Sequence, residues 1–172
     1  MTGDTPLSRR RLLASGALAL TGAFAGCADD ETGDADGSTG ATGATDSPAD
    51  LDRQEANVVG TGVTVRDGDY RFDVTLHHDD AGEDGYANWW QVERLDGTRL
   101  GRRDLSHPHS EQPFTRSATI SVPESVDCVV VRGHDQTHGY GGQAMVVTPD
   151  SGATRAVSQG SDPRSSEGMD CP

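Results

Sequence analysis

The residues of this 172-residue chain best suited to chemistry are six histidines that fall in three close pairs. The pairs are His77 with His78, His107 with His109, and His134 with His138. Carboxylates stand beside them, among them Glu111 and Asp135. Imidazole and carboxylate groups are suitable ligands for Zn or Cu. The same groups also suit the binding of a polar ligand or acid–base chemistry.

The middle pair has a local reason to act together. The residue before a proline is held extended, and Pro108 separates His107 from His109. Side chains two positions apart on an extended chain project to the same side. The alternative is that these are loop histidines that bind no metal. The absence of a spacing such as His-Glu-x-x-His favours that alternative.

Short segments of alternating apolar and polar residues, separated by turn residues, position these histidines. The seven expected strands cover 57–66, 70–78, 87–95, 99–105, 114–122, 126–134 and 143–148. Asp67-Gly68 and Asp96-Gly97 are typical of tight hairpins. The pattern predicts an all-β immunoglobulin- or fibronectin-III-like sandwich of about seven antiparallel strands. A small β-barrel or jelly roll is the alternative.

In such an antiparallel arrangement, the second, fourth and sixth strands end at the same pole. Because each histidine pair lies at or just after one of these ends, we expect all six imidazoles to gather there. Binding residues are commonly carried on loops that a rigid scaffold holds in place. The candidate residues for a metal or polar ligand are His78, His107, His109, Glu111, Asp135 and His138.

Two stretches of this pole carry a resemblance. His107-Pro108-His109-Ser110-Glu111-Gln112-Pro113-Phe114-Thr115-Arg116-Ser117 and Asp135-Gln136-Thr137-His138-Gly139-Tyr140-Gly141-Gly142 resemble a family of small exported bacterial and archaeal proteins. The resemblance spans about Tyr70–Val147. It implies a shared domain and singles out His78, His107, His109, Glu111, Arg116, Asp135 and His138. The family has no established activity, so the resemblance names no ligand.

Enzymatic motifs are missing, and we assign no catalytic residue. The sequence has no Gly-x-Ser-x-Gly elbow and no glycine-rich phosphate loop before a helix. With 28 acidic residues, 14 arginines and a formal charge of −14, the surface repels nucleic acid. We therefore predict a binding or interaction module for an unknown protein or small ligand. A transition-metal-binding lipoprotein and a hydrolase of low specificity are the alternatives.

The N-terminus is typical of an export signal. Arg9 and Arg10, followed by Arg11 and two leucines, precede an apolar run from Leu12 to Ala25. That run is shorter than the roughly 20 residues that a membrane span needs. The paired arginines resemble a twin-arginine signal, and the residues closing on Cys27 resemble a lipobox. We expect residues 1–26 to be a signal peptide and Cys27 to carry a lipid at the outer face of the cytoplasmic membrane.

The composition divides the exported part into three. Residues 27–55 are rich in Asp, Gly, Thr and Ser, which predicts a disordered acidic linker. Residues 56–149 hold the alternating segments of the sandwich domain, and 150–172 read as an irregular tail. High Asp content without any lysine resembles the proteins of extremely halophilic archaea.

Two cysteines remain if Cys27 is lipidated. In an oxidising compartment such a pair normally forms a disulfide. Strand parity places Cys128 on the outer face of its sheet, where a passing segment can reach it. Cys171 lies near the end of the polar tail. We predict that these two cysteines are bonded and that the bond folds the tail back across the sheet.

Overall fold

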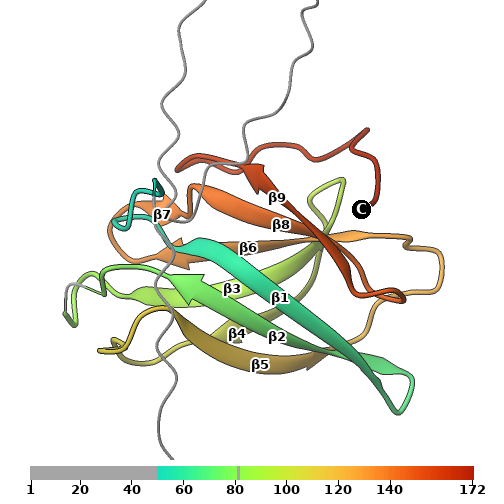
Figure 1. The fold of residues 1–172 in the computed structure, drawn as a ribbon, viewed down its shortest axis with the longest axis horizontal. Coiled ribbons are helices and arrows are strands. Elements are labelled where there is room, and N and C mark those ends of the chain that lie inside the picture. The colour runs from blue at the N-terminus through green and yellow to red at the C-terminus, as the bar shows by residue number, and fades with distance from the viewer. Residues whose placement is uncertain (1–49, 81) are drawn as a thin grey trace, which may run out of the picture. The chain divides into compact units, whose positions relative to one another are not determined.

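The computed structural model describes residues 50–80 and 82–172, and every regular element in that part of the chain is a β-strand (Figure 1). The strands are β1 (Asn57–Arg66), β2 (Asp69–His77), β3 (Ala87–Arg94), β4 (Arg99–Asp104), β5 (Phe114–Ile120), β6 (Val129–Asp135), β7 (Gly139–Tyr140), β8 (Gln143–Thr148) and β9 (Ala153–Ser158). No helix in the described part is long and apolar enough to cross a membrane.

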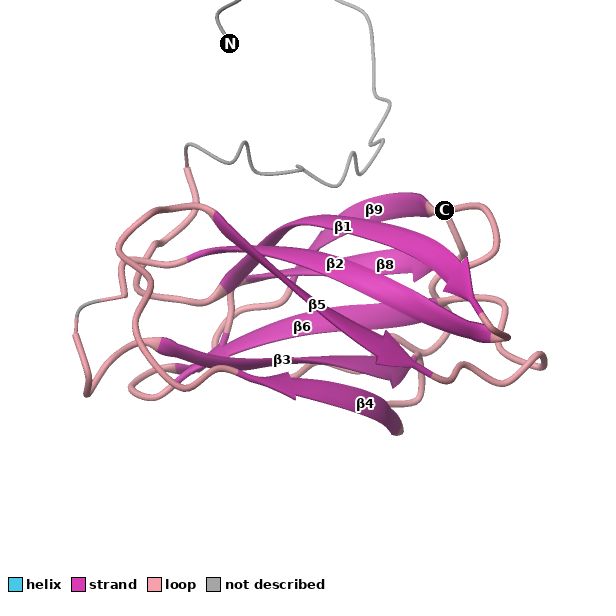
Figure 2. Cartoon of the chain, turned by 90° about the horizontal axis from the view of Figure 1, so that it is seen from below, coloured by secondary structure: helices cyan, strands magenta, loops and turns pink. Residues whose placement is uncertain are grey.

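These strands form two antiparallel sheets, as predicted. One has the order β1-β2-β5, and the other has the order β4-β3-β6-β8-β9 with β7 paired to β6. An immunoglobulin-like sandwich likewise places its first, second and fifth strands in one sheet and its third, sixth and seventh in the other. Figure 2 shows the strands of both sheets with only loops between them. The all-β sandwich is confirmed.

The core lies between the sheets and follows the predicted alternation. Phe72, Val74 and Leu76 of β2 are fully buried, and their polar neighbours on the strand face outward. On β3, Trp90 and Val92 face the same core. The alternation therefore fixes which face of each strand is buried.

The C-terminal tail differs from the prediction. Ala153–Ser158 forms β9 beside β8, so the expected irregular tail at 150–172 begins with a strand. The sequence from Ala153 to Ser158 is short and largely polar, so it did not predict a strand. Ala156 and Val157 become partly buried only through the pairing with β8. The remaining tail crosses the outer face of the second sheet, where Met169 packs beside Cys128 and Val146.

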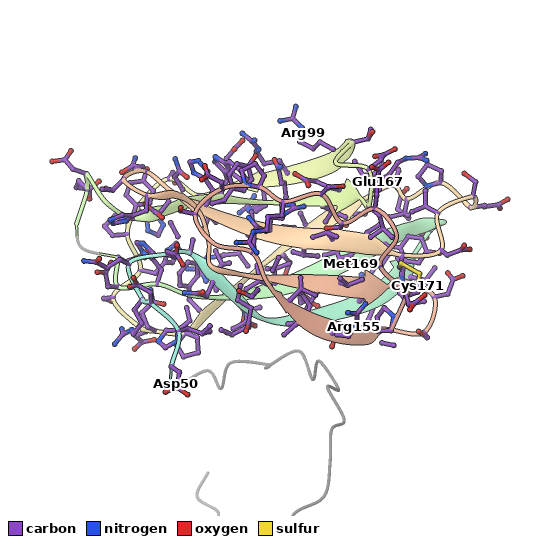
Figure 3. All side chains as sticks on the ribbon, turned by 90° about the horizontal axis from the view of Figure 1, so that it is seen from above. Asp50, Arg99, Arg155, Glu167, Met169 and Cys171 are labelled. Carbon is purple, nitrogen blue, oxygen red and sulfur yellow. A yellow bond between two sulfur atoms is a disulfide. The ribbon has the colours of Figure 1, made fainter. Side chains whose placement is uncertain are left out.

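The predicted disulfide holds this tail. Cys128 and Cys171 are bonded, with Cα atoms 5.7 Å apart, and Figure 3 shows the yellow bond at the end of the domain away from Asp50. A second anchor was not predicted. The guanidinium of Arg132, 3% exposed, donates 2.6 Å bonds to Glu93 Oε2 and to the Arg164 carbonyl. The partners of Arg132 lie far from it along the chain, so no local sequence pattern predicts these contacts.

Candidate functional site

The loops at one end of the sandwich carry the histidines, as the strand parity predicted, but the six imidazoles do not form one cluster, since His134 stacks on Trp89 instead. The β2–β3, β4–β5 and β6–β8 connections meet there with the segment that precedes β1, at the left of Figure 1. His78 follows β2, His109 lies between β4 and β5, and Asp135 ends β6. We refer to this end of the domain as the histidine pole.

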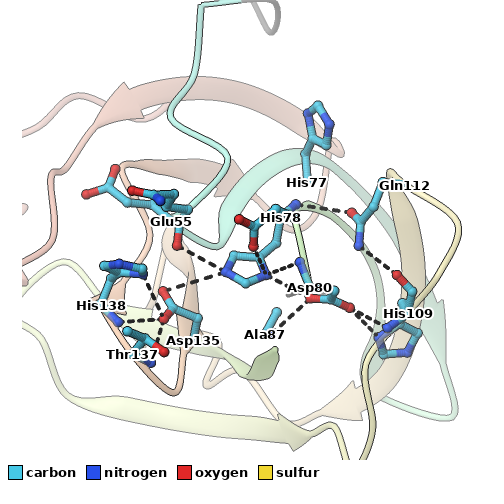
Figure 4. Close-up of polar contacts among 12 residues, drawn as sticks. Glu55, His77, His78, Asp80, Ala87, His109, Gln112, Asp135, Thr137 and His138 are labelled. Atoms are coloured by element: carbon cyan, nitrogen blue, oxygen red, sulfur yellow. Dashed lines mark hydrogen bonds and ion pairs between the residues drawn. The ribbon is translucent and has the colours of Figure 1, made fainter. Parts of the chain in front are cut away.

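Asp80 is the hub of the histidine pole, and its side chain is only 1% exposed. Its Oδ1 lies 2.8 Å from His78 Nδ1 and accepts a 3.0 Å bond from the backbone N–H of Ala87. Its Oδ2 accepts the backbone N–H of His109 and lies 3.3 Å from the Nδ1 of that ring. One buried carboxylate therefore ties the β2–β3 loop to the β4–β5 loop (Figure 4).

The backbone of the hub is itself unusual. Asp80 has φ +45°, a left-handed conformation that a non-glycine residue rarely adopts. Aspartate tolerates this region better than most residues, because its short side chain bonds nearby backbone. Such an outlier persists only where its surroundings hold it, and here four contacts hold the carboxylate.

His78 is buried between two carboxylates. Its Nδ1 faces Asp80, and its Nε2 lies 3.1 Å from the carbonyl oxygen of Gln54 and 4.0 Å from Asp135 Oδ2. Its backbone N–H donates to the side chain of Gln112, which in turn donates to the His109 carbonyl. His78 therefore fastens the segment before β1 and the β4–β5 loop to the end of β2.

Asp135 organises the third loop. Its Oδ1 accepts the backbone N–H groups of Thr137 at 2.8 Å and His138 at 2.6 Å, and it lies 3.4 Å from His138 Nδ1. Its Oδ2 is buried and has no hydrogen-bond partner. His138 is 40% exposed, and among the described candidate residues it contacts Asp135 alone. It therefore lies at the margin of the network.

The glycines after His138 have structural roles. Gly139 has φ +88°, which favours glycine. A Cβ on Gly141 would lie 2.0 Å from the carbonyl oxygen of Ala56, and one on Gly142 would lie 2.0 Å from Glu55 Oε2. The glycine-rich stretch therefore lets the chain entering β1 pass directly over the start of β8.

The stretch that carries His107 and His109 lines a pocket of about 410 Å³. Its walls are His107, Pro108, His109, Ser110, Glu111, Pro113, Phe114, Thr115 and Arg116. The ring of His109 stacks on Phe114, with centroids 3.7 Å apart. The centroid of the His107 ring lies 4.9 Å from that of the His109 ring. Two of the six candidate residues, His107 and Glu111, are exposed in this pocket. We refer to it as the β4–β5 pocket.

Burial and neighbouring charges shift the pKa of one imidazole that lines the pocket. Desolvation lowers the pKa of His109, the positive charge of Arg116 lowers it further, and the Asp80 carboxylate opposes both. On the far side of the pole, burial and the nearby carboxylates of Asp52 and Asp135 raise the pKa of Glu55. The pole therefore favours a neutral imidazole at His109.

His134 belongs to a separate cluster on the rim of the second sheet. Its ring stacks on Trp89 at 4.1 Å, and the Arg102 guanidinium lies 3.8 Å from the centroid of the indole ring. Tyr140 meets both rings edge-on. Burial lowers the pKa of His134. This stack joins β3, β4 and β6 and does not open into the β4–β5 pocket.

No group of three or more His, Cys, Asp or Glu side chains within 50–80 and 82–172 is arranged to hold a metal ion. The structure brings together His78, His109, Asp135 and His138 through Asp80 and through hydrogen bonds, and it leaves His107 and Glu111 in the pocket. His78 and Asp135 therefore belong to a buried hydrogen-bonded network with His138 at its margin, and His109 joins that network to the open pocket. Arg9, Arg10 and Cys27 lie outside the described residues, as does the expected linker before Asp50.

The sequence alone did not single out Asp80. It lies in the run His77-His78-Asp79-Asp80, which reads as a polar loop. Only its contacts show that it is buried while its neighbour Asp79 is 39% exposed. A carboxylate that follows directly after a buried strand, beside a histidine, is the one local signal that was present.

Comparison with known proteins gives one relative. Over 127 residues the chain is 65% identical to a protein from Halomicrobium mukohataei. That relative is named "Putative lipoprotein". The match covers 72% of this chain and 62% of the relative. The name agrees with the exported, lipid-anchored location predicted from Arg9, Arg10 and Cys27. No protein-family model and no solved structure matches the chain.

Proposed function

We propose that this chain is an exported, lipid-anchored binding module that holds a small polar ligand in the β4–β5 pocket. The lipobox-like residues before Cys27, the paired arginines and the name of the relative support the anchor. In this proposal residues 1–26 direct export through the twin-arginine route. The linker begins at Cys27 and ends before Asp52, because Asp52 and Gln54 are already held beside β1 and His78. The sandwich that follows carries the pocket.

The observation that carries the proposal is the rigid support of the pocket by Asp80. A buried carboxylate that contacts two imidazoles and two backbone N–H groups fixes one wall of the pocket before any ligand arrives. Preorganised walls reduce the ordering cost of binding. Exposed imidazole, carboxylate and guanidinium groups around the opening supply polar contacts, while Phe114 and two prolines supply apolar surface.

The anchor is tested by membrane fractionation. We expect wild-type chain in the membrane fraction, and Cys27→Ala chain released from it, because the lipid supplies the attachment. Replacing Arg9 and Arg10 with lysine is expected to leave the precursor in the cytoplasm. Membrane retention of Cys27→Ala at the wild-type level would contradict the anchor.

The pocket is tested by native mass spectrometry of the chain isolated from its own membranes. We expect a bound mass that is lost in Ser110→Trp, because Ser110 lines the pocket and the much larger indole reduces the space for a ligand. Ser151→Trp is the matched control, since Ser151 is also exposed but lies in the β8–β9 turn at the other end of the domain. An adduct that survives equally in both variants, or no adduct in the wild type, contradicts the proposed pocket.

A further inference from the structure

We infer that His107 and His109 form a two-imidazole site for a divalent transition-metal ion, with water completing the coordination. This inference deepens the proposed function and rests on the β4–β5 pocket, since both rings line it. It concerns these two rings alone and not the six candidate residues of the pole.

The ring of His107 presents one nitrogen as an acceptor. Its Nδ1 lies 3.0 Å from the carbonyl oxygen of Pro108. A carbonyl oxygen accepts hydrogen bonds only, so Nδ1 carries the proton of the neutral ring. Nε2 is then left with a free lone pair, which is the form that binds a metal ion.

A carboxylate lies beside Nδ1 of His109, as the Pro108 carbonyl does beside Nδ1 of His107. The Nδ1 of His109 lies 3.3 Å from Asp80 Oδ2, and Asp80 is itself fixed by His78 and by the N–H of Ala87. A carboxylate behind an imidazole fixes its tautomer and makes the opposite nitrogen a better ligand. The Nδ1 of His109 is buried and has no hydrogen-bond partner, so the Asp80 carboxylate at 3.3 Å is the nearest acceptor available to it.

The two rings are close enough to share an ion. Their centroids lie 4.9 Å apart with an angle of 40° between the planes. Pro108 keeps His107 extended, so both side chains leave the backbone on one side. His109 is 7% exposed and packs against Phe114, whereas His107 is exposed and is held only by its contact with the Pro108 carbonyl. One fixed and one adjustable imidazole make a site that an ion enters easily.

Two charged side chains in the pocket change its affinity for a metal ion in opposite directions. The Glu111 carboxylate attracts a cation, and the Arg116 guanidinium repels one. Structural zinc sites use four protein ligands, whereas the described residues offer no group of three. A site with two protein nitrogens keeps open positions, which suits capture and release of an ion more than permanent retention. Imidazole prefers Cu²⁺ over the other divalent ions of its row.

The test is calorimetric titration of the detergent-solubilised lipoprotein with Cu²⁺. We expect one ion per chain, and an affinity at least about tenfold weaker in His107→Ala. His107 is exposed, so this variant keeps the fold, which circular dichroism checks. His138→Ala is the matched control, because His138 lies outside the β4–β5 pocket. The affinity of this variant for Cu²⁺ should stay at the wild-type value. Glu111→Gln should weaken binding, and Arg116→Gln should strengthen it.

The outcomes separate this inference from the proposed function. No Cu²⁺ binding by the wild type, or equal losses in His107→Ala and His138→Ala, overturns the two-imidazole site. If the native adduct that is sensitive to Ser110→Trp persists in that case, the pocket stands and its ligand is of another class. If Cu²⁺ binds with the expected pattern but no native adduct is found, the metal site stands and the proposed small polar ligand is wrong.

Discussion

The carboxylate of Asp80 lies 2.8 Å from Nδ1 of His78, and both side chains are 1% exposed. This contact lies at the centre of the histidine pole, because the same carboxylate also holds the backbone of the two neighbouring loops. Removing the carboxylate leaves the buried backbone N–H groups of Ala87 and His109 without their acceptor. We therefore expect Asp80 to contribute strongly to the order of the pole.

Replacing Asp80 with alanine is expected to lower the free energy of unfolding by about 3–5 kcal/mol, because several buried hydrogen-bonding groups lose their acceptor, each at a cost of about 1–3 kcal/mol. Urea denaturation measures the change. Asp79→Ala is the control, since Asp79 lies 3.6 Å from the same nitrogen but is 39% exposed. We expect it to cost under about 1 kcal/mol. Equal losses in the two variants would mean that Asp80 is not the hub.

The chain is expected to lose stability as the pH falls below 6.5, the ordinary pKa of histidine. Burial lowers the pKa values of His77, His109 and His134 in the folded state, so the unfolded chain binds protons first. Stability from these groups is complete above pH 6.5 and declines below it, toward their folded pKa values. Unfolding in urea between pH 8 and 5 measures this, and His134→Gln should flatten the slope. An unchanged slope in that variant would contradict the assignment.

Arg132 and Glu93 form a buried ion pair, so a second substitution at Glu93 should recover part of the stability that is lost by a substitution at Arg132. Arg132→Met is expected to cost about 3–5 kcal/mol, because it leaves Glu93 buried and unpaired. Adding Glu93→Leu should restore much of that loss, since the unpaired charge is then gone. Urea denaturation of the two variants and the wild type measures the recovery. A double variant no more stable than Arg132→Met would contradict the pairing.

Gly141→Ala tests the close passage of the chain over β8. The new methyl would sit 2.0 Å from the carbonyl oxygen of Ala56, so we expect a loss of about 2–3 kcal/mol or more from overpacking. In Gly62→Ala the nearest atom is the Asp73 Cβ at 3.8 Å, and we expect little change. Thermal unfolding of both variants measures the difference, and similar melting temperatures would show that the passage is not tight.

Much of the fold follows from the sequence, because alternation fixes both the strands and their buried faces. The segment 57–66 and β1 share the same bounds, and strand parity placed the histidines at one pole before any contact was known. The strand β9 could not be found in this way, since its apolar residues matter only against β8. Asp80 and Arg132 were missed for a related reason. Their burial depends on partners in other loops or in the tail, and local patterns do not describe such contacts.

The central claim is that binding at the histidine pole takes place in the β4–β5 pocket and not across the whole pole. The most direct measurement is a nuclear magnetic resonance titration of the ¹⁵N-labelled lipoprotein with Zn²⁺, a diamagnetic ion that imidazole also binds. We predict shifts confined to the backbone amides of the non-proline residues from His107 to Arg116, together with the amide of Asp80. Shifts centred on Asp135 and His138, with the pocket amides unchanged, would contradict the claim.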